Sequence, residues 1–457
     1  MDIQNCVSAA QAIEKINKVQ PDLNAVVTMI EEEKNTNVGK LAGVPVALKD
    51  NISTRGVRTT ASSRILDNYV PVYDATIVEK LKAAGADFVC KASMDELGMG
   101  GTNKNAYTGP VHNPYDLNRI PGGSSGGCAA LVAAGCVPLA IGTDTGDSIR
   151  KPAAYCGVVG VKPTYGRISR YGIIPYASSL DHVGYFTTNV KDAALALEVL
   201  AGRDDHDMTS SYKEVFNYSD LLNSDLHGKT IGVFKTVMDE VKNEDLKAQF
   251  DALVSKLKEK GATIVEVEMP KEYMELIAPV YKTIANAEAT ANHSNLDGIR
   301  FGMREEGNDL EEVMTNTRTK GFSSYVRARF VIGSYSLFEE NQDRLFRKAQ
   351  KIRRLIVESY AKMFEKCDGV LCVAAPTIAP EIHESQDVRF GVSSFAEEHM
   401  QLGNFSGYPS ITLPLGKVDS MPVGVNLTCK PFEEQMMFDL SSAIEECTGL
   451  KNQCLEG

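Results

Sequence analysis

Residues 121–134 read PGGSSGGCAALVAA. Its first half is a short loop in which glycine pairs flank Ser124 and Ser125, and its second half is a run of small apolar residues. Free N–H groups at the start of such a helix favour an anion or a polarised oxygen, and glycine permits rare backbone geometry beside a serine. The alternative is a flexible Gly/Ser linker, which the shortness of the loop and its apolar flanks disfavour.

A second segment, GTDTGDSIR at 142–150, follows an apolar run from Val137 to Ile141. Ser148 stands where a turn presents its hydroxyl, with neighbouring N–H groups placed as an oxyanion hole. A serine at this position is also an ordinary helix N-cap. This segment alone leaves both interpretations open.

A third feature is Lys49, at the end of an apolar strand predicted over 44–48. A lysine held close to buried residues loses solvation, which lowers its pKa by up to about 3–5 units when burial is complete. A neutral amine is then available as a base near neutral pH. The alternatives are a strand-end lysine that extends to water or one that pairs with Asp50.

Helix and strand patterns alternate along the chain, which favours an α/β sheet. A polar, irregular stretch at 203–228 is predicted to be a surface insertion, and the charged segment 303–320 a surface hairpin or a lid. The predicted helices are 7–19, 75–84, 244–259 and 334–366. Pro21 is expected to end the first of them, and the last is the longest. The predicted strands are 44–48, 88–90, 229–236, 262–268, 370–374 and 411–413.

The chain has 457 residues and a net charge of −12. This length allows one large α/β domain or two to three average ones. An acidic chain is a poor binder of phosphate backbones, because binding requires lysine and arginine to replace counterions. Any RNA is therefore expected to be held by another protein of a complex.

A cluster of basic residues lies on the longest predicted helix. It is interpreted as a solvated helix face, and the alternative is a surface that binds a partner or RNA. The cluster comprises Arg344, Arg347, Lys348, Lys351, Arg353 and Arg354.

The cysteines and the hydropathy pattern indicate a cytoplasmic protein. Ten scattered cysteines without a C-x-x-C pair predict buried thiols in a reducing compartment. The first residues, MDIQNCVSAA, do not resemble a signal peptide. No apolar run reaches the roughly 18 residues of a membrane span.

Competing catalytic motifs are incomplete. Matches to S-x-x-K at 210–213 and 255–258 have no companion motifs, and GKT at 228–230 lacks the first glycine of a phosphate-binding loop. The seven histidines form no metal pair at short spacing. A Ser-His-Asp triad stays an alternative, although the richest segments contain lysine and serine rather than histidine.

Taken together, PGGSSGG at 121–127, GTDTGDSIRKPAAYCG at 142–157 and Lys49 in VPVALKDN resemble the amidase-signature family. The resemblance covers nearly the whole chain. It implies a single large α/β domain over 1–457, with a mixed central β-sheet flanked by helices on both faces and a catalytic core at about 40–200.

The resemblance implies a Lys–Ser–Ser triad. By match, Ser148 is the nucleophile, Ser124 follows a cis peptide and bridges, and Lys49 is the base. A neutral lysine takes a proton through Ser124, so that Ser148 attacks an amide carbonyl. The implied oxyanion hole is formed by the backbone N–H groups of Thr145, Gly146, Asp147 and Ser148.

Within this family, three runs are similar to the glutamine-hydrolysing subunits of tRNA-dependent amidotransferases: HNPYDLNRIPGGSSGG at 112–127, KPTYGRISRYGIIPYASSLD at 162–181 and NFSGYPSITLPLG at 404–416. The resemblance then implies three substrate contacts. Tyr281 is the first of these contacts. Arg329 is the second and binds the carboxylate of the substrate. The third is an acidic side chain of the protein, which binds the α-amino group of the substrate. This chain has Glu397 and Glu398 where that group has an aspartate, so an extra methylene shifts the third contact.

A further departure is Asp147, which stands before the nucleophile where the family has glycine. Its N–H survives, but a residue with a Cβ resists positive φ and its charge opposes an oxyanion. A pairing with Lys151 or Arg150 would turn the carboxylate away. The chain also starts about 30 residues later than the family pattern, which is expected to alter a partner surface.

The resemblance implies that ammonia passes to a partner that activates glutamyl-tRNA with ATP. The expected partners are the B and C subunits of a heterotrimer, with tRNA held mainly by the B subunit and with ATP and magnesium on the partner. No cofactor or metal is expected in this chain. Two alternatives stay open: a stand-alone amidase that acts on small amides without partners, and a non-catalytic scaffold that forms no acyl-enzyme.

Overall fold

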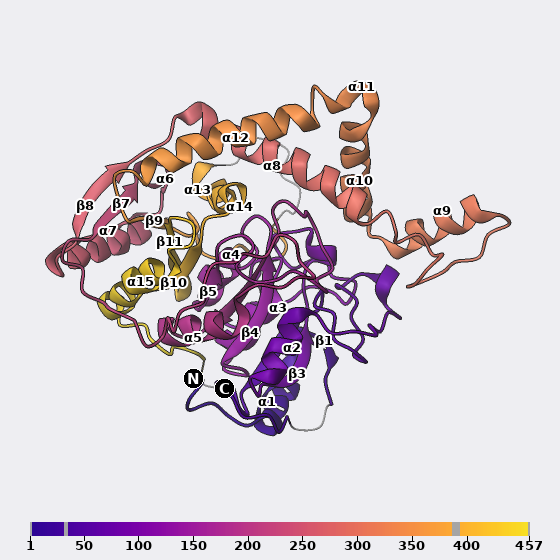
Figure 1. The fold of residues 1–457 in the computed structure, drawn as a ribbon, viewed down its shortest axis with the longest axis horizontal. Coiled ribbons are helices and arrows are strands. Elements are labelled where there is room, and N and C mark those ends of the chain that lie inside the picture. The colour runs from indigo at the N-terminus through magenta and orange to yellow at the C-terminus, as the bar shows by residue number, and fades with distance from the viewer. Residues whose placement is uncertain (1, 32–34, 386–393, 456–457) are drawn as a thin grey trace.

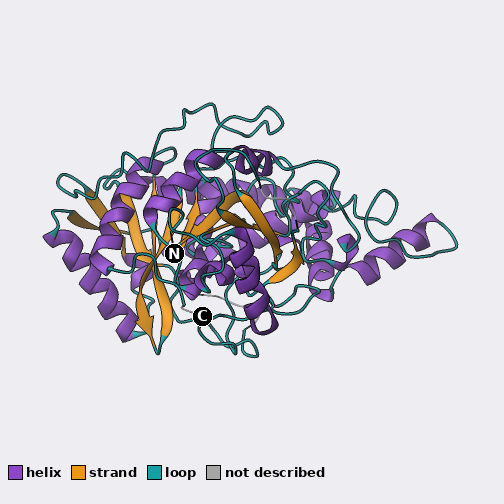
Figure 2. Cartoon of the chain, turned by 90° about the horizontal axis from the view of Figure 1, so that it is seen from below, coloured by secondary structure: helices purple, strands orange, loops and turns teal. Residues whose placement is uncertain are grey.

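An eleven-stranded β-sheet runs through the molecule, with helices on both faces (Figures 1 and 2). The computed structural model describes residues 2–31, 35–385 and 394–455. The strands are β1 (Val26–Met29), β2 (Pro45–Lys49), β3 (Asp87–Ala92), β4 (Leu139–Asp144), β5 (Val159–Lys162), β6 (His182–Thr187), β7 (Thr230–Phe234), β8 (Thr263–Val267), β9 (Gly369–Val373), β10 (Ser410–Val418) and β11 (Met421–Cys429).

The sheet is mixed, as the family resemblance implies. Its strand order is β1-β3-β2-β4-β6-β5-β10-β11-β9-β7-β8. β2 lies parallel to β3 and β4, and β7 lies parallel to β8 and β9. The other neighbours are antiparallel. A single continuous sheet confirms one large α/β fold.

The helices are α1 (Ala9–Leu23), α2 (Thr76–Ala83), α3 (Gly126–Ala133), α4 (Arg150–Cys156), α5 (Val190–Leu200), α6 (Lys235–Met238), α7 (Glu244–Glu259), α8 (Lys271–Asn292), α9 (Leu310–Gly321), α10 (Ser324–Leu337), α11 (Glu339–Gln342), α12 (Phe346–Met363), α13 (Phe395–Glu398), α14 (Gln401–Ser406) and α15 (Glu434–Thr448), with short 3-10 turns at Arg64–Leu66 and Glu96–Gly98. α15 contacts both α5 and α7, and α3 contacts α4.

Local sequence explains several elements directly. β10 and β11 form a hairpin whose two-residue turn, Asp419 and Ser420, has φ of 49° and 66°. Such turns match the twist of the strands and tolerate short polar residues. α3 consists of small and apolar residues that are all buried, which suits a helix packed directly against β2, β4 and β6.

The site is positioned by the parallel pair β2 and β4. Leu48 of β2 lies beside Ile141 of β4 in register. Because parallel strands end at the same edge of a sheet, Lys49 and the segment that follows β4 meet there. The loop 121–127 leads into α3 at the same place.

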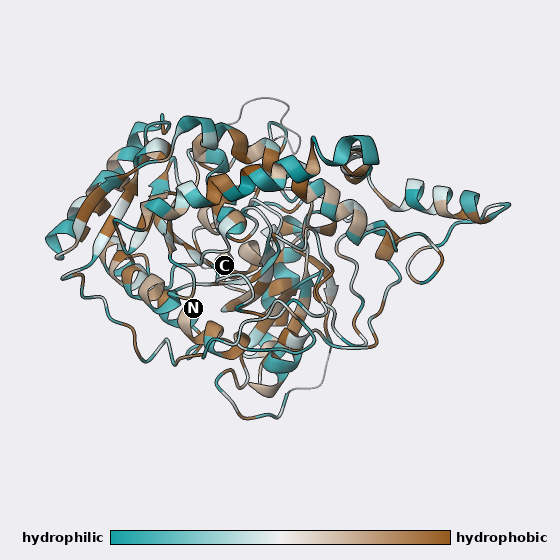
Figure 3. Ribbon diagram, turned by 45° about the horizontal axis from the view of Figure 1, so that its top comes forward, coloured by the Kyte–Doolittle hydropathy of each residue, from teal (hydrophilic) through white to brown (hydrophobic). Residues whose placement is uncertain are grey.

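The predicted helix over 334–366 is wrong in its extent. The chain forms α10, α11 and α12 there, and the longest helix is α8, with 22 residues. Phe338 is extended, with ψ 143°, and the Asn341 side chain donates to the carbonyl of Tyr335 at 2.9 Å. A side chain that bonds a helical carbonyl competes with helix continuation. Along α12, hydrophilic and hydrophobic residues alternate (Figure 3), and its buried positions include Ile356 and Tyr360.

Two further expectations are corrected. Pro21 does not end the first helix; α1 continues to Leu23 and closes at Asn24, which is left-handed and donates from its side chain to two loop carbonyls. The segment 303–320 does not form a β-hairpin, because α9 projects there as a largely hydrophilic helix (Figures 1 and 3); its alternative interpretation as a lid stays a prediction.

Residues 203–228 join α5 to β7 without a helix or strand, and Tyr218 and Leu226 within them are buried. All ten cysteines are free thiols, seven of them buried. Arg353 of the basic cluster is partly buried against the carbonyl of Phe405, whereas Arg354 is exposed. Among the described residues, none of the helices has the length and apolar character needed to cross a bilayer.

Candidate active site

Lys49 lies at the end of β2 and is fully buried. Its Nζ donates to Ser124 Oγ at 2.8 Å, to Ser125 Oγ at 2.8 Å and to Thr143 Oγ1 at 2.9 Å. Burial lowers the pKa of Lys49 to about 8. The structure therefore places a lysine that loses its proton near pH 8 beside three hydroxyls.

The loop that carries Ser124 is closely packed. The Gly123–Ser124 peptide bond is cis, and Ser124 is 2% exposed. A Cβ at Gly123 would lie 2.1 Å from a carboxylate oxygen of Asp95, and one at Gly126 would lie 2.7 Å from the Asn103 side-chain oxygen. Only glycine fits at these two positions, so the loop holds Ser124 in one place.

Ser148 lies in the segment that follows β4 and is 3% exposed. Its carbonyl accepts from the N–H of Ser125 at 3.2 Å, which ties this segment to the serine loop. Within the part of the chain that the structure describes, no hydrogen bond joins the Ser124 and Ser148 hydroxyls. The geometry thus links Lys49 to Ser124 directly and brings Ser148 alongside through the backbone.

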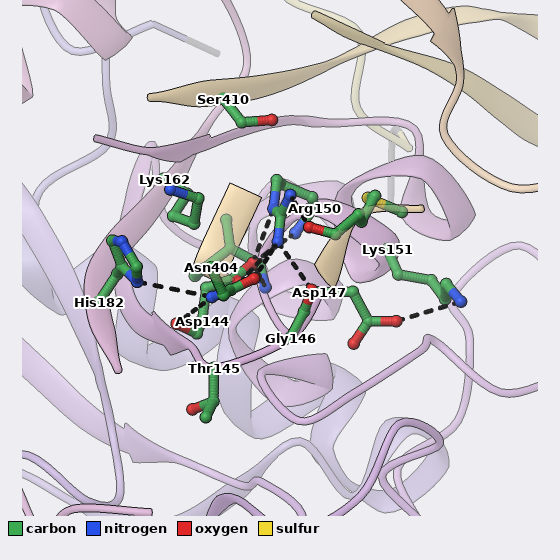
Figure 4. Close-up of polar contacts among 12 residues, drawn as sticks. Asp144, Thr145, Gly146, Asp147, Arg150, Lys151, Lys162, His182, Asn404 and Ser410 are labelled. Atoms are coloured by element: carbon green, nitrogen blue, oxygen red, sulfur yellow. Dashed lines mark hydrogen bonds and ion pairs between the residues drawn. The ribbon is translucent and has the colours of Figure 1, made fainter. Parts of the chain in front are cut away.

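A buried ion pair holds the Ser148 segment in shape (Figure 4). Asp144 accepts from the N–H of Ile149 at 2.9 Å and pairs with Arg150 at 2.9 Å. Asn404 of α14 donates to the same carboxylate at 2.9 Å. Burial opposes the charge of Asp144, but the Arg150 guanidinium outweighs it and holds the pKa of this carboxyl below its ordinary value.

The backbone of the same segment provides unused donors. Among the described residues, none accepts a hydrogen bond from the N–H groups of Thr145, Gly146, Asp147 or Ser148. Successive free N–H groups suit a developing negative charge. The carbonyl of Gly146 accepts from Arg150 at 2.8 Å, which orients this peptide.

Asp147 avoids the strain that its Cβ would meet at positive φ. The backbone of Asp147 does not adopt a positive φ. Its carboxylate pairs with Lys151 at 3.1 Å (Figure 4), whereas Arg150 is occupied by Asp144. Of the two expected partners, the structure selects Lys151.

A cavity of about 160 Å³ lies beside this segment and brings the predicted substrate contacts together. Tyr281 of α8, Arg329 of α10 and Glu397 of α13 all line it, although they are far apart in sequence. Glu398 also lines it. The Tyr281 hydroxyl lies close over Gly146, since a Cβ there would be 2.9 Å from it.

Arg329 and Glu397 are held in different ways. Arg329 donates to the Tyr176 hydroxyl at 3.1 Å, to Asn286 at 3.3 Å and to the Tyr325 hydroxyl. Glu397 is already engaged, because Lys151 contacts its carboxylate at 3.1 Å and its carbonyl at 3.0 Å. The acidic contact predicted for a substrate ammonium is therefore shared with a lysine of the site.

Several residues of the site are not given a role by the sequence motifs that contain them. Ser125, Thr143 and Asp144 lie within the quoted motifs, and their apolar flanks are the available signal of burial. Tyr176 and Asn404 lie in runs quoted for the family resemblance. Their contacts with Arg329 and Asp144 join distant segments, so no local pattern could reveal them.

A possible cation site elsewhere is confined to the surface. In the described ranges, the acidic and histidine side chains close enough to share an ion are Glu381, His383 and Glu384. His383 and Glu384 are exposed, and none of the three lines the cavity.

The amidase family model matches residues 7–438. The solved structure of a peptide amidase from Stenotrophomonas maltophilia is 27% identical, covers 97% of this chain and 94% of its own, and superposes with a TM-score of 0.83. The chain belongs to the amidase family.

Curated relatives narrow this assignment. The A subunit of the glutamyl-tRNA(Gln) amidotransferase of Fusobacterium nucleatum is 41% identical over 98% of this chain and 95% of its own. Its counterpart in Carboxydothermus hydrogenoformans is 42% identical over 97% of this chain and 94% of its own length. The crystal structure of the counterpart from Thermotoga maritima has a TM-score of 0.83 at 34% identity, over 98% and 94% of the two chains. Within the amidase family, the chain is grouped with these A subunits.

Proposed function

We propose that this chain is the glutaminase subunit of a glutamyl-tRNA(Gln) amidotransferase. One observation carries the proposal: a cationic, an aromatic and an acidic side chain from three distant helices line one cavity beside the Ser148 segment. Glutamine carries a carboxylate and an ammonium, and a site with Arg329 and a carboxylate group matches both charges. The similarity to A subunits supports the same function.

The proposed reaction starts with a proton transfer. Ser148 gives its proton to Ser124, and Ser124 gives its own to neutral Lys49, while Ser148 Oγ bonds to the side-chain carbonyl carbon of glutamine. The N–H groups of 145–148 stabilise the resulting oxyanion. Each such donor is worth about 2.7–4 kcal/mol in transition-state stabilisation.

The second half releases ammonia and then glutamate. The C–N bond breaks as Lys49 returns its proton through Ser124 to the leaving nitrogen, which leaves a glutamyl ester on Ser148. Water attacks this ester while the same lysine accepts a proton, and Ser148 recovers its hydrogen. In this scheme the chain itself uses side chains and backbone only.

The partner assignments follow from the proposed role. The B and C subunits complete the complex, and ATP and magnesium act on the partner that receives the ammonia. The charge of −12 argues against this chain as the main binder of tRNA, which is therefore assigned to the B subunit.

The test is co-expression with candidate B and C subunits. We expect a stable complex that forms Gln-tRNA from Glu-tRNA with glutamine, and also with ammonium chloride in place of glutamine. A lone chain that turns over many simple amides at the rate of the complex would favour the stand-alone amidase. A complex that uses ammonium chloride but not glutamine, with no acyl-enzyme on any amide, would identify a scaffold subunit.

A further inference from the structure

Lys151 is clamped between two carboxylates that belong to different parts of the site. Its Nζ lies 3.1 Å from Asp147 Oδ2 and 3.1 Å from Glu397 Oε2, and it donates to the Glu397 carbonyl at 3.0 Å. Lys151 is 8% exposed. It thus connects the segment after β4 with α13, and all three residues line the cavity. Figure 4 shows the contact between Lys151 and Asp147.

The Asp147 carboxylate depends on this lysine. Asp147 immediately precedes Ser148 and lines the same cavity as Tyr281. Across the described ranges, Lys151 is the one cation that pairs with it. Arg150, the neighbouring cation, is committed to Asp144 and to the carbonyl of Gly146, so it cannot replace Lys151.

A carboxylate beside an oxyanion hole opposes catalysis unless it is neutralised and held away. Negative charge develops on the substrate oxygen in the transition state, and a nearby anion in a buried site raises the energy of that state. Lys151 has the charge to counter this: burial opposes its ionisation, but the Glu397 and Asp147 carboxylates outweigh burial and keep the pKa of Lys151 above its ordinary value.

We propose that Lys151 is a positioning residue that holds the Asp147 carboxylate away from the oxyanion and so makes an acidic residue beside the nucleophile compatible with catalysis. Glu397 anchors the lysine from the opposite side, so Lys151 cannot follow Asp147 toward the substrate. This inference rests on the proposed glutaminase reaction and assigns a role in it to a side-chain contact of this chain.

The test is a double-mutant cycle in the assembled complex, with ammonia release from glutamine as the readout. Lys151→Met is expected to lower kcat on the order of 10-fold to 100-fold, with KM changed by less than about 3-fold, because the freed charge acts on the transition state. In an Asp147→Asn background the same lysine substitution is expected to change kcat by less than about 3-fold. Lys151→Arg, which keeps the charge, is expected to retain more activity than Lys151→Met.

Each contrary result has a distinct meaning. An equal loss of kcat in both backgrounds would overturn the inference, since Lys151 would then act without Asp147. A loss seen only in KM would also overturn it and assign Lys151 to Glu397 and substrate binding. Thermal unfolding of every variant separates misfolding from catalysis, and Lys151→Gln replaces Lys151→Met if the latter does not fold. A parental complex that uses ammonium chloride but releases no ammonia from glutamine would refute the proposed function itself, and this inference with it.

Discussion

At the scale of single residues, the environment of Lys49 sets the chemistry that the site can perform. Complete burial and three hydroxyl partners distinguish it from an exposed lysine at a strand end. Desolvation disfavours the charged amine, so the neutral form is populated near pH 8. The proposed proton path therefore depends on the burial of Lys49, because burial is what leaves its amine neutral and able to accept a proton.

The nucleophile assignment predicts the behaviour of Ser148→Ala. This variant is expected to lose glutamine hydrolysis by at least about 10³-fold, while the complex still forms and still uses ammonium chloride, because one missing member disables a triad that acts as a unit. Lys49→Ala is expected to lose a comparable amount. Ammonia release at the parental rate from Ser148→Ala would contradict the assignment.

Lys49 also predicts a pH profile. As pH rises through about 8, Lys49 loses its proton and becomes able to accept one. We expect kcat/KM for glutamine to increase with pH with a midpoint near that value, measured as ammonia release between about pH 6 and 9.5. A profile that is flat or falls across this range would rule out a neutral lysine base.

At the scale of elements, the site is held by contacts between segments rather than by any one helix or strand. The segment after β4 is tied to α14 through Asp144, Arg150 and Asn404. α8 and α10 approach closely, because a Cβ at Gly333 would lie 2.1 Å from the carbonyl oxygen of Asn286. The first contact shapes the segment after β4, and the second shapes the wall of the cavity.

The buried ion pair predicts a large stability effect. Asp144→Ala leaves Arg150 buried without its carboxylate, and we expect a loss of about 3–5 kcal/mol in the free energy of unfolding. Glu358→Ala, which removes an exposed pair with Arg354, is the control and is expected to cost less than about 1 kcal/mol. Urea unfolding of both variants measures the loss in the free energy of unfolding. An equal loss in the two variants would show that the buried pair stabilises the fold no more than the exposed one.

The close packing of α10 against α8 predicts a coupled effect on substrate binding. Gly333→Ala forces the helices apart, which we expect to cost about 1–3 kcal/mol of stability and to raise KM for glutamine, since Arg329 lies one turn away on α10. Val331→Ala, at a position 70% exposed on the same helix, is expected to leave both nearly unchanged. A Gly333→Ala enzyme with parental Tm and KM would show that this contact does not position Arg329.

At the scale of the whole molecule, one sheet unites residues from both halves of the chain. β5 pairs with β10, so a strand from residues 159–162 depends on one that begins at residue 410. β10 in turn pairs with β11 and carries the sheet on to β7 and β8. The predicted catalytic core at 40–200 therefore has an open sheet edge when taken alone.

This continuity predicts that the first half of the chain does not fold by itself. A fragment of residues 1–228 exposes the edge of β5 and the apolar face beneath α15, and such edges promote aggregation. We expect an insoluble or aggregated product by size-exclusion chromatography, against a soluble full-length chain prepared in parallel. A monomeric fragment with cooperative unfolding would instead make residues 1–228 a domain.

Elements with a clear local pattern could be predicted closely, and elements shaped by long-range contacts could not. The apolar run before Lys49 and the helix at 244–259 agree with β2 and α7. α8, which carries Tyr281, is not among the predicted helices, and the single helix predicted over 334–366 is three helices. α8 packs against α10 and α12, and these contacts join segments that are distant in the sequence. In the stretch 334–366, a hydrogen bond from the Asn341 side chain to the carbonyl of Tyr335 competes with helix continuation.

By itself, the sequence determined which residue types carry the chemistry, because the glycine, serine and lysine motifs at 49, 121–127 and 142–150 impose local backbone and charge requirements. It also determined that Asp147 needed a partner. Only the tertiary structure decided that the partner is Lys151, that Glu397 shares this lysine, and that Arg329 lies beside Tyr281 in the same cavity. Lys151 is only four residues from Asp147, and the pairing of Arg150 with Asp144 decided between the two neighbouring cations. Glu397 and Arg329 reach the site only because the sheet and helices pack across hundreds of residues, and no local pattern encodes that packing.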